Sequence, residues 1–354
     1  MVKSKPKPST SATLTPDMIL AIDLGGTKCE MAVYRPGNDS FSGFARYACR
    51  DFHGIEAVLR RYQEEHNRTP NDLLGNLPKR LAVAVAGLVD GDQAQMTNLD
   101  WRLEGKKMRQ AFGLDEVLLV NDLTAVCAAV PCLGADDLLV LQKGERRMAA
   151  PVAVLAPGTG LGEGMLITGG GCQHALGGEG GHCDFAPVND EQIELLRFMR
   201  KRHQSVSYEM LAAGPAMIHL FEFCQENSGL AARPEVASRL AMASDKTPVI
   251  IDAALAADFC PLCRKTLELF LEILGAEAGN LALKIYARGG LYLAGGILPR
   301  LVGKISFAPF LAAFNNKKMM ASLLAAIPVF LVRHPHPALL GAVRLACSNQ
   351  KTDG

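Results

Sequence analysis

Two polar clusters contain residue types that carry out chemistry in enzymes. The first, Asn121-Asp122, ends the apolar run VLLVND and precedes the helix-like stretch TAVCAAV. Asp122 could cap that helix, which is a common role for Asp at a helix start. It could instead act as a general base, because phosphoryl transfer needs a carboxylate that accepts the proton of the attacking hydroxyl. An ordinary aspartate, with a pKa of about 3.9, is ionised at neutral pH and ready for that role.

The second cluster is the segment GGEGGH from Gly177 to His182, in which four glycines surround Glu179 and His182. Because glycine destabilises regular helices and strands, we expect an irregular backbone that aims both side chains into a pocket. Glutamate accepts hydrogen bonds from hydroxyl groups, and histidine donates or accepts them. A flexible surface loop is the alternative. A metal-ligand role for His182 is less favoured, since no partner lies at ligand spacing.

Glycine-rich turns follow three of the apolar runs. They are Asp23-Leu24-Gly25-Gly26-Thr27, Gly158-Thr159-Gly160 and Ala294-Gly295-Gly296. A glycine backbone can approach a phosphate closely because it lacks a Cβ, and Asp23 could hold a hydrated Mg²⁺. The third turn is expected to open a helix whose amides and dipole face a nucleotide. One such turn is weak evidence, since glycine is the usual residue of tight turns, but three in this order indicate a two-lobed ATP clamp.

Strand-like and helix-like stretches alternate along the chain, which indicates an α/β fold. The expected strands are Ile19–Leu24, Leu81–Gly87, Val117–Asn121, Val152–Ala156, Gly290–Ala294 and Val329–Val332, and the expected helices include Ile55–His66, Asp190–Arg202 and Pro261–Ala287. In such folds ligands bind where strands end and loops gather, and the candidate residues lie at those positions. No internal repeat of about 20–50 residues is visible.

The bulk composition is typical of a soluble protein with two domains. The chain has 354 residues, of which 49% are hydrophobic and 21% charged, and this length is comfortable for two domains. A net charge of +1 does not suggest binding to nucleic acid or a membrane surface. No apolar run reaches the roughly 20 residues of a membrane-spanning helix. Residues 1–16 are rich in Lys, Pro, Ser and Thr, without the apolar run of a signal peptide, and we expect a disordered tail.

Ten scattered cysteines suit a reducing compartment, so a cytoplasmic location is expected. Only Cys260 and Cys263 have CxxC spacing. With neither a second pair nor a histidine nearby, a metal or redox role for them is weakly supported. Two cysteines at the start of a helix are the alternative.

The ordered set of motifs resembles the bacterial-type glucokinases, a family of the actin-like ATPase and hexokinase superfamily. The matching motifs are IDLGGT at 22–27, MTNLDW at 96–101, VNDLTA at 120–125, GTGLG at 158–162, GGEGGHCDFAP at 177–187, AAGP at 212–215, GNLAL at 279–283 and AGGILPR at 294–300. The resemblance implies a two-lobed actin-like (ribonuclease H-like) α/β fold with a cleft between the lobes. The small lobe would contain residues 17–132 and 337–350, and the large lobe residues 133–336.

The resemblance also implies the ATP-dependent phosphorylation of glucose to glucose 6-phosphate, which feeds glycolysis. Asp122 would be the catalytic base, and Mg²⁺ would arrive with ATP near Asp23, without a fixed metal site. The residues implied for glucose are Asn121, Asp122, Glu179, His182 and Glu209. Without the resemblance, Glu209 would be interpreted as a solvated helix carboxylate. The residues implied for the nucleotide are Ile22, Asp23, Leu24, Gly25, Gly26, Thr27, Gly158, Thr159, Gly160, Gly295 and Gly296.

The sequence departs from the family pattern at Lys28, where Asn is more usual after GGT. GGTK is commoner in the related repressor–kinase family, which typically carries a cysteine-rich zinc motif after its Glu-Gly-His region. Cys183 stands alone at that point and DFAP follows, which favours the glucokinase interpretation. The basic N-terminal tail is a second departure.

Three other functions stay open on the sequence. The acceptor could be mannose or fructose, because discrimination between similar hexoses rests on a few hydrogen bonds. A non-catalytic sugar-sensing regulator would usually have an N-terminal helix-turn-helix, for which sixteen Lys/Pro-rich residues are too few. An actin-like ATPase without a sugar acceptor would have no use for GGEGGH. The expected partners are a hexose and ATP, and the resemblance allows a homodimer.

Overall fold

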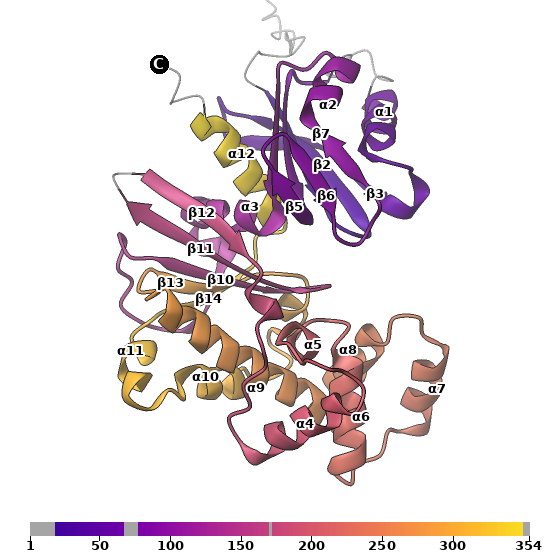
Figure 1. Cartoon of the computed structure of the whole chain (residues 1–354), viewed down its shortest axis with the longest axis vertical. Helices are drawn as coiled ribbons and strands as arrows, with labels where there is room; N and C mark the ends of the chain where they lie inside the picture. The colour runs from indigo at the N-terminus through magenta and orange to yellow at the C-terminus, as the bar shows by residue number, and fades with distance from the viewer. Residues whose placement is uncertain (1–17, 67–76, 170–171, 350–354) are drawn as a thin grey trace, which may run out of the picture. The chain divides into compact units, whose positions relative to one another are not determined.

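The computed structural model describes residues 18–66, 77–169 and 172–349, and they form two compact α/β units (Figure 1). One unit holds the described residues up to Ala129 together with those from His336 onward, and the other holds those from Val130 to Pro335. The tail expected at residues 1–16 lies outside the described residues. The lobe boundaries expected from the sequence remain a prediction.

The first unit is built on a five-stranded sheet with the order β3-β2-β1-β4-β8. Its strands are β1 (Ile19–Leu24), β2 (Lys28–Arg35), β3 (Ser40–Ala48), β4 (Arg80–Val85) and β8 (Glu116–Asn121). β2 is antiparallel to both β1 and β3, whereas β4 and β8 run parallel to β1. A separate small sheet contains β5 (Gly87–Asp90), β6 (Gln93–Met96) and β7 (Arg102–Glu104).

Alternation along β1 divides its side chains between two apolar layers. Leu20 and Ile22 pack in the layer that also contains residues of α1 (Ile55–His66) and α2 (Gly105–Phe112). Ile19 and Ala21 pack in the opposite layer, which contains residues of α3 (Asp122–Ala129) and α12 (Pro337–Asn349). Figure 1 shows the two helix pairs on opposite faces of this sheet. By the same alternation, Asp23 continues the face covered by α3.

The second unit is built on a six-stranded sheet with the order β12-β11-β10-β13-β14-β9. Its strands are β9 (Leu138–Gln142), β10 (Val152–Pro157), β11 (Leu161–Gly169), β12 (Cys172–Gly178), β13 (Gly290–Leu293) and β14 (Val329–Val332). Strands β10, β11 and β12 are antiparallel, and β13 and β14 run parallel to β10. Five strands of this sheet therefore repeat the topology of the first, three antiparallel strands followed by two parallel ones, and β9 adds a sixth strand antiparallel to β14, although the sequence shows no repeat.

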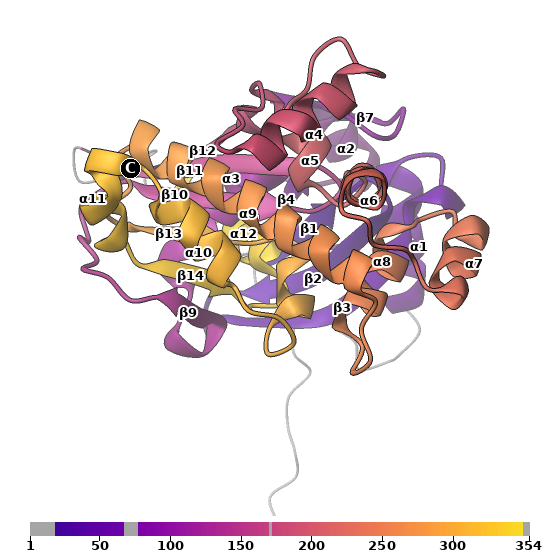
Figure 2. The same ribbon diagram turned by 90° about the horizontal axis from the view of Figure 1, so that it is seen from below.

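The long helix α9 (Pro261–Lys284) forms the centre of the helical layer in the second unit. Sixteen of its 24 residues are buried. Figure 2 shows α9 side by side with α10 (Ala308–Asn315), and the two helices are in contact. The other helices of this unit are α4 (Asp190–Arg200), α5 (Glu209–Ala212), α6 (Met217–Asn227), α7 (Pro234–Met242), α8 (Thr247–Leu255) and α11 (Ala321–Ala325).

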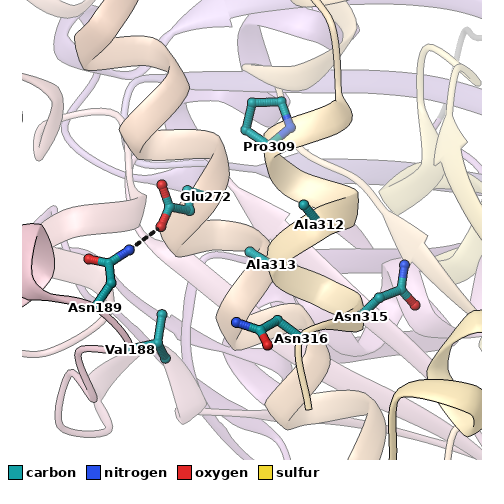
Figure 3. Close-up of a pocket in the computed structure, with 8 residues that line it drawn as sticks. All are labelled: Val188, Asn189, Glu272, Pro309, Ala312, Ala313, Asn315 and Asn316. Atoms are coloured by element: carbon teal, nitrogen blue, oxygen red, sulfur yellow. Dashed lines mark hydrogen bonds between the residues drawn. The ribbon is translucent and has the colours of Figure 1, made fainter. Parts of the chain in front are cut away.

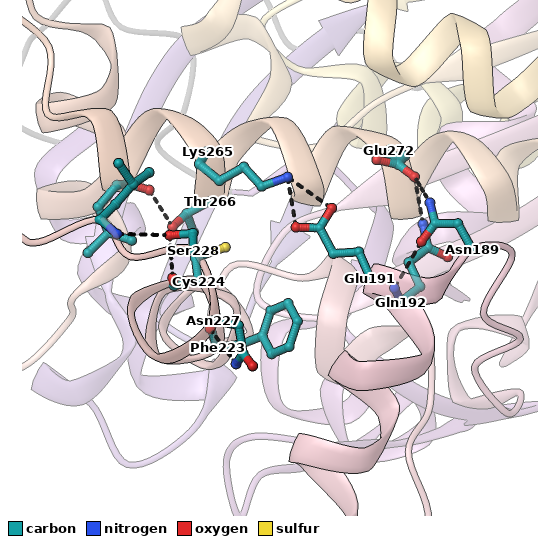
Figure 4. Close-up of polar contacts among 12 residues, drawn as sticks. Asn189, Glu191, Gln192, Phe223, Cys224, Asn227, Ser228, Lys265, Thr266 and Glu272 are labelled. Atoms are coloured by element: carbon teal, nitrogen blue, oxygen red, sulfur yellow. Dashed lines mark hydrogen bonds and ion pairs between the residues drawn. The ribbon is translucent and has the colours of Figure 1, made fainter.

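A polar network joins the start of α4 to α9 (Figure 4). The Asn189 side chain caps α4 by accepting from the Gln192 amide at 2.9 Å, and its own amide donates to Glu272 at 2.7 Å. The buried Gln192 side chain also donates to Glu272, at 2.9 Å. Lys265 of α9 pairs with Glu191 at 2.7 Å. These contacts fix the chain just after the DFAP segment.

The six strands and three helices expected from the sequence are all present, with ends that differ by at most three residues. Within the described part of the chain, none of the helices has the length and apolarity to span a membrane.

Candidate functional site

Asn121 and Asp122 lie where β8 passes directly into α3. The Asn121 Oδ1 atom accepts from the Thr124 amide at 3.1 Å, and its Nδ2 atom donates to the Gly87 carbonyl at 3.1 Å. Asp122 Oδ1 accepts from the Leu123 amide at 2.8 Å. The hydrogen bond to the third helical residue, which defines a cap, therefore comes from Asn121 and not from Asp122. Asp122 is the first residue of α3, with one carboxylate oxygen oriented by the backbone.

Asp23, at the end of β1, belongs to the same electrostatic environment as Asp122. Burial, the charge of Asp122 and then that of Glu30 raise the pKa of Asp23 to about 7, while Lys28 opposes the rise. The two aspartates are therefore close enough for repulsion between their carboxylates. A divalent cation would relieve this repulsion, and carboxylate oxygens are the ligands that Mg²⁺ prefers. The donor set thus fits Mg²⁺.

The Gly-Gly-Thr turn after Asp23 connects β1 to β2. The Gly25 amide donates to the Lys28 carbonyl at 2.9 Å, and the Thr27 carbonyl accepts from the Cys49 amide at 3.0 Å. Lys28, which departs from the family pattern, pairs with the buried carboxylate of Glu30 at 3.0 Å.

In the second unit, the turn Gly158-Thr159-Gly160 occupies the equivalent position between β10 and β11. The Gly158 amide donates to the Gly160 carbonyl and the Gly158 carbonyl accepts from the Gly214 amide, both at 2.8 Å. Thr247 Oγ1 donates to the Gly214 carbonyl at 2.7 Å. Gly214 and Thr247 were not among the predicted site residues. The AAGP motif was the available sign for Gly214, whereas nothing in the sequence pointed to Thr247.

The third glycine turn packs against the end of β10. Gly295 has a φ of +84°, and a Cβ there would lie 2.4 Å from the Pro157 carbonyl oxygen. The expected helix after this turn is a single 3₁₀ turn at Leu298–Leu301. The argument from a helix dipole is therefore wrong for Gly295 and Gly296, because so short a helix aligns few peptide dipoles.

Glu179, His182 and Glu209 are brought together by β12, the 3₁₀ turn η4 (Gly180–His182) and α5. His182 Nε2 lies 3.7 Å from Glu179 Oε2 and 3.9 Å from Glu209 Oε1. Glu209 Oε2 accepts from the Leu161 amide at 2.8 Å, so the interpretation of Glu209 as a solvated helix carboxylate is wrong. The Glu179 and His182 side chains are more than half exposed and can take hydrogen bonds from a polyhydroxyl ligand.

The structure thus contains two groups of predicted site residues, one in each unit. The first unit positions Asp23, the turn at 25–27, Asn121 and Asp122. The second positions Glu179, His182 and Glu209 next to the turn at 158–160. Gly160 approaches Glu209 so closely that a Cβ would lie 2.5 Å from its Oε2 atom.

A pocket of about 520 Å³ in the second unit contains none of the predicted site residues (Figure 3). It is lined by Val188, Asn189, Glu272, Pro309, Ala312, Ala313, Asn315 and Asn316. Cys260 and Cys263 are both buried at the start of α9. Among the described residues, no cluster of three or more His, Cys, Asp or Glu side chains could hold a metal ion. We therefore define the site by the polar residues and glycine turns at the strand ends.

Two α/β units of shared topology, with glycine turns after β1 and β10 and an acidic and histidine cluster beside the second turn, define a sugar kinase of the actin-like class. The sequence profile of the glucokinase family matches residues 20–349. The glucokinase of Yersinia pestis (strain Pestoides F) is 35% identical over 320 residues, which cover 90% of this chain and 93% of that protein. The chain belongs to the glucokinase family, and this membership confirms its predicted activity, the ATP-dependent phosphorylation of glucose.

Solved structures confirm the predicted two-lobed actin-like fold class. A glucokinase from an Antarctic psychrotroph has a TM-score of 0.75 at 29% identity, with 94% of this chain and 99% of that chain covered. A ROK family glucokinase from Streptomyces griseus, solved with glucose and AMPPNP, has a TM-score of 0.64 at 20% identity, with 94% and 99% covered. At 20% identity, the similarity to the Streptomyces griseus structure shows only that the fold is shared.

Proposed function

We propose that this chain transfers the γ-phosphoryl group of ATP to the 6-hydroxyl of glucose with the residues described above. The observation that supports this most is the hydrogen bond from Leu161 to Glu209. This bond fixes Glu209, a proposed sugar ligand, to the residue that directly follows the glycine turn at 158–160. One backbone segment would therefore position both a sugar-binding carboxylate and a phosphate-binding turn. What we propose is which residues bind the two substrates, which residue acts as the base, and that the acceptor is the 6-hydroxyl.

Glucose would be held by the side chains of Asn121, Asp122, Glu179, His182 and Glu209. Carboxylates accept hydrogen bonds from sugar hydroxyls, and His182 donates or accepts. Asp122 would accept the proton of the 6-hydroxyl while a bond forms between that oxygen and the γ-phosphorus. The bond from the γ-phosphorus to the bridging oxygen breaks, and ADP leaves with that electron pair.

ATP would be held by the three glycine turns, whose backbones can approach phosphates without a Cβ in the way. These turns contribute Ile22, Asp23, Leu24, Gly25, Gly26, Thr27, Gly158, Thr159, Gly160, Gly295 and Gly296. To these we add Gly214 and Thr247, which hold the second turn in place. When bound with ATP, Mg²⁺ supplies positive charge that offsets the charge of the phosphates, and Asp23 is the residue that would hold it.

Removal of Mg²⁺ by EDTA should abolish turnover, and Asp23→Asn should raise the Mg²⁺ concentration for half-maximal rate by about tenfold or more, the loss of one charged ligand. Initial rates at fixed ATP and glucose over a Mg²⁺ series would measure this. Asp115→Asn is the matched control, because Asp115 is exposed and lies before β8. An unchanged Mg²⁺ requirement in Asp23→Asn would remove Asp23 from the proposed site.

A cytoplasmic location and a homodimer are part of the same proposal. The cytoplasmic location rests on the scattered cysteines of the sequence, which suit a reducing compartment. Sedimentation of the purified chain with and without glucose would test the dimer.

The experiment that tests the function is a panel of hexoses with purified protein and MgATP, followed by release of ADP. We expect sugar-dependent release that is greatest with glucose. A preference for mannose or fructose would keep the mechanism and change the acceptor. Sugar binding without turnover, measured by calorimetry or by the fluorescence of Trp101, would support the sugar-sensing regulator instead.

A further inference from the structure

Glu163 is a buried carboxyl group directly beneath the turn that carries His182. It lies on β11, pairs in register with Gly178 of β12, and is only 4% exposed. A Cβ on Gly180 would lie 2.1 Å from Glu163 Oε2, so the backbone of η4 rests on this side chain. Glu163 Oε1 has no hydrogen-bond partner among the described residues, which is costly for a buried polar atom.

Glu277 of α9 is a second carboxyl group next to Glu163, and it is fully buried. Two adjacent buried carboxylates repel each other, whereas a protonated carboxyl donates a hydrogen bond to its neighbour. Burial, then the charge of Glu277, raises the pKa of Glu163 to about 7, and Lys284 opposes the rise. A proton on Glu163 would therefore give its unpartnered oxygen a hydrogen bond to Glu277.

Glu277 is held from several sides by other polar groups. Asn280 donates to its Oε2 atom at 2.8 Å, and Lys284 lies 3.4 Å from its Oε1 atom. Asn280 also donates to the Tyr208 hydroxyl at 3.1 Å and accepts from Lys317 at 2.6 Å. Burial, then the charge of Glu277, raises the pKa of Tyr208 to about 12, so this phenol stays protonated at neutral pH. Cys183 lies near Lys284 on the turn side.

This buried cluster contacts both chain segments of the second unit that carry proposed sugar ligands. Glu163 supports Gly180, which lies between Glu179 and His182. Tyr208 directly precedes Glu209, and its amide donates to the Cys183 carbonyl at 3.1 Å. A change in the charge of the cluster would therefore act on both segments together.

We propose that Glu163 is a positioning residue of the sugar site, and that its carboxyl must be protonated and hydrogen-bonded to Glu277 for the Glu179–His182 turn to bind glucose. This inference rests on the proposed sugar-binding role of that turn. Loss of the proton leaves two adjacent buried carboxylates, with the ammonium groups of Lys284 and Lys317 on the Glu277 side, and repulsion between the carboxylates displaces the turn above Glu163. Glucose affinity should therefore fall as the pH rises through about 7.

The test is the KM for glucose between pH 6 and pH 8.5 at saturating MgATP. If glucose binds only the protonated form, the KM should rise about tenfold from pH 6 to pH 8, since each pH unit above the pKa reduces the competent fraction about tenfold. The kcat at saturating glucose should change much less. Glu163→Gln keeps a hydrogen-bond donor and cannot ionise, so its KM should stay low and flat over this range.

Two further variants separate charge from packing. Glu277→Gln removes the second carboxylate and should also give a flat profile, whereas Glu235→Gln, at an exposed position on α7, should keep the wild-type rise. A rise that persists in Glu163→Gln would overturn the inference, and so would a flat wild-type profile with normal glucose turnover. Failure to bind or phosphorylate glucose at any pH would instead overturn the proposed function, and this inference with it.

Discussion

Asp122→Asn should lower the kcat for glucose by about 10²–10⁴-fold, the range typical for loss of a general base. The expected loss is confined to the chemical step, because the new amide oxygen can still accept from the Leu123 amide and keep the start of α3 intact. Glucose binding measured by calorimetry should change by less than about tenfold, since one hydrogen bond of several is altered. Initial rates at saturating glucose and MgATP measure the loss.

The same variant has an electrostatic consequence at Asp23. Asp122 is the largest charged contributor to the raised pKa of Asp23, so removal of its charge should lower that pKa and leave Asp23 more fully ionised at neutral pH. A reduced kcat together with a KM for MgATP close to that of the wild type would separate loss of the base from a damaged nucleotide site. Turnover close to that of the wild type, with glucose still bound, would show that Asp122 is not the base.

Asp23, Asn121 and Asp122 could be predicted because they lie at the ends of strands whose pattern is strongly apolar, whereas Glu179 and His182 were predicted from the GGEGGH segment and Glu209 from the family resemblance. Ile19–Leu24 and Val329–Val332 match β1 and β14 residue for residue, since continuous apolar runs bounded by polar or glycine residues leave few alternatives. Asp23 and Asp122 then lie at strand ends, where an α/β fold places its ligands. The sequence thus placed this part of the candidate site through the strands that carry it.

The shared topology of the two units could not be predicted, because it depends on strand order and not on sequence similarity. The antiparallel strands β2, β3, β11 and β12 have mixed patterns of buried and exposed residues, which no strong apolar run marks. The 3₁₀ turn after Gly296 ends before Val302, whose ψ of 130° is not helical, and Gly303 follows with a φ of +70°.

The Glu163 cluster was also missed, because it depends on contacts between β11 and α9. These elements are about 100 residues apart in the sequence, and a glutamate in a strand is ordinarily interpreted as facing solvent. Burial of a charged residue type is therefore information that only the tertiary structure supplies.

Gly181→Ala should raise the KM for glucose by about 10–100-fold, although it adds only one methyl group. A Cβ at Gly181 would lie 2.2 Å from the Leu161 carbonyl oxygen, and Leu161 cannot retreat because it pairs with Pro157 of β10. The turn must therefore move instead, and His182 moves with it. Because the Leu161 amide also holds Glu209, Glu209 stays in place, and the substitution separates His182 from it. Overpacking of this kind also costs about 1–3 kcal/mol of stability.

Gly169→Ala is the matched control, because Gly169 lies on β11, the strand that also contains Leu161, and a Cβ there would meet no described atom within 4 Å. Its KM for glucose and its melting temperature should stay close to those of the wild type. In Gly181→Ala, the KM for MgATP should change much less than that for glucose, since the glycine turn at 158–160 keeps its bonds to Gly214. Equal losses for both substrates would indicate general unfolding of the unit, and an unchanged glucose KM would show that this turn does not bind the sugar.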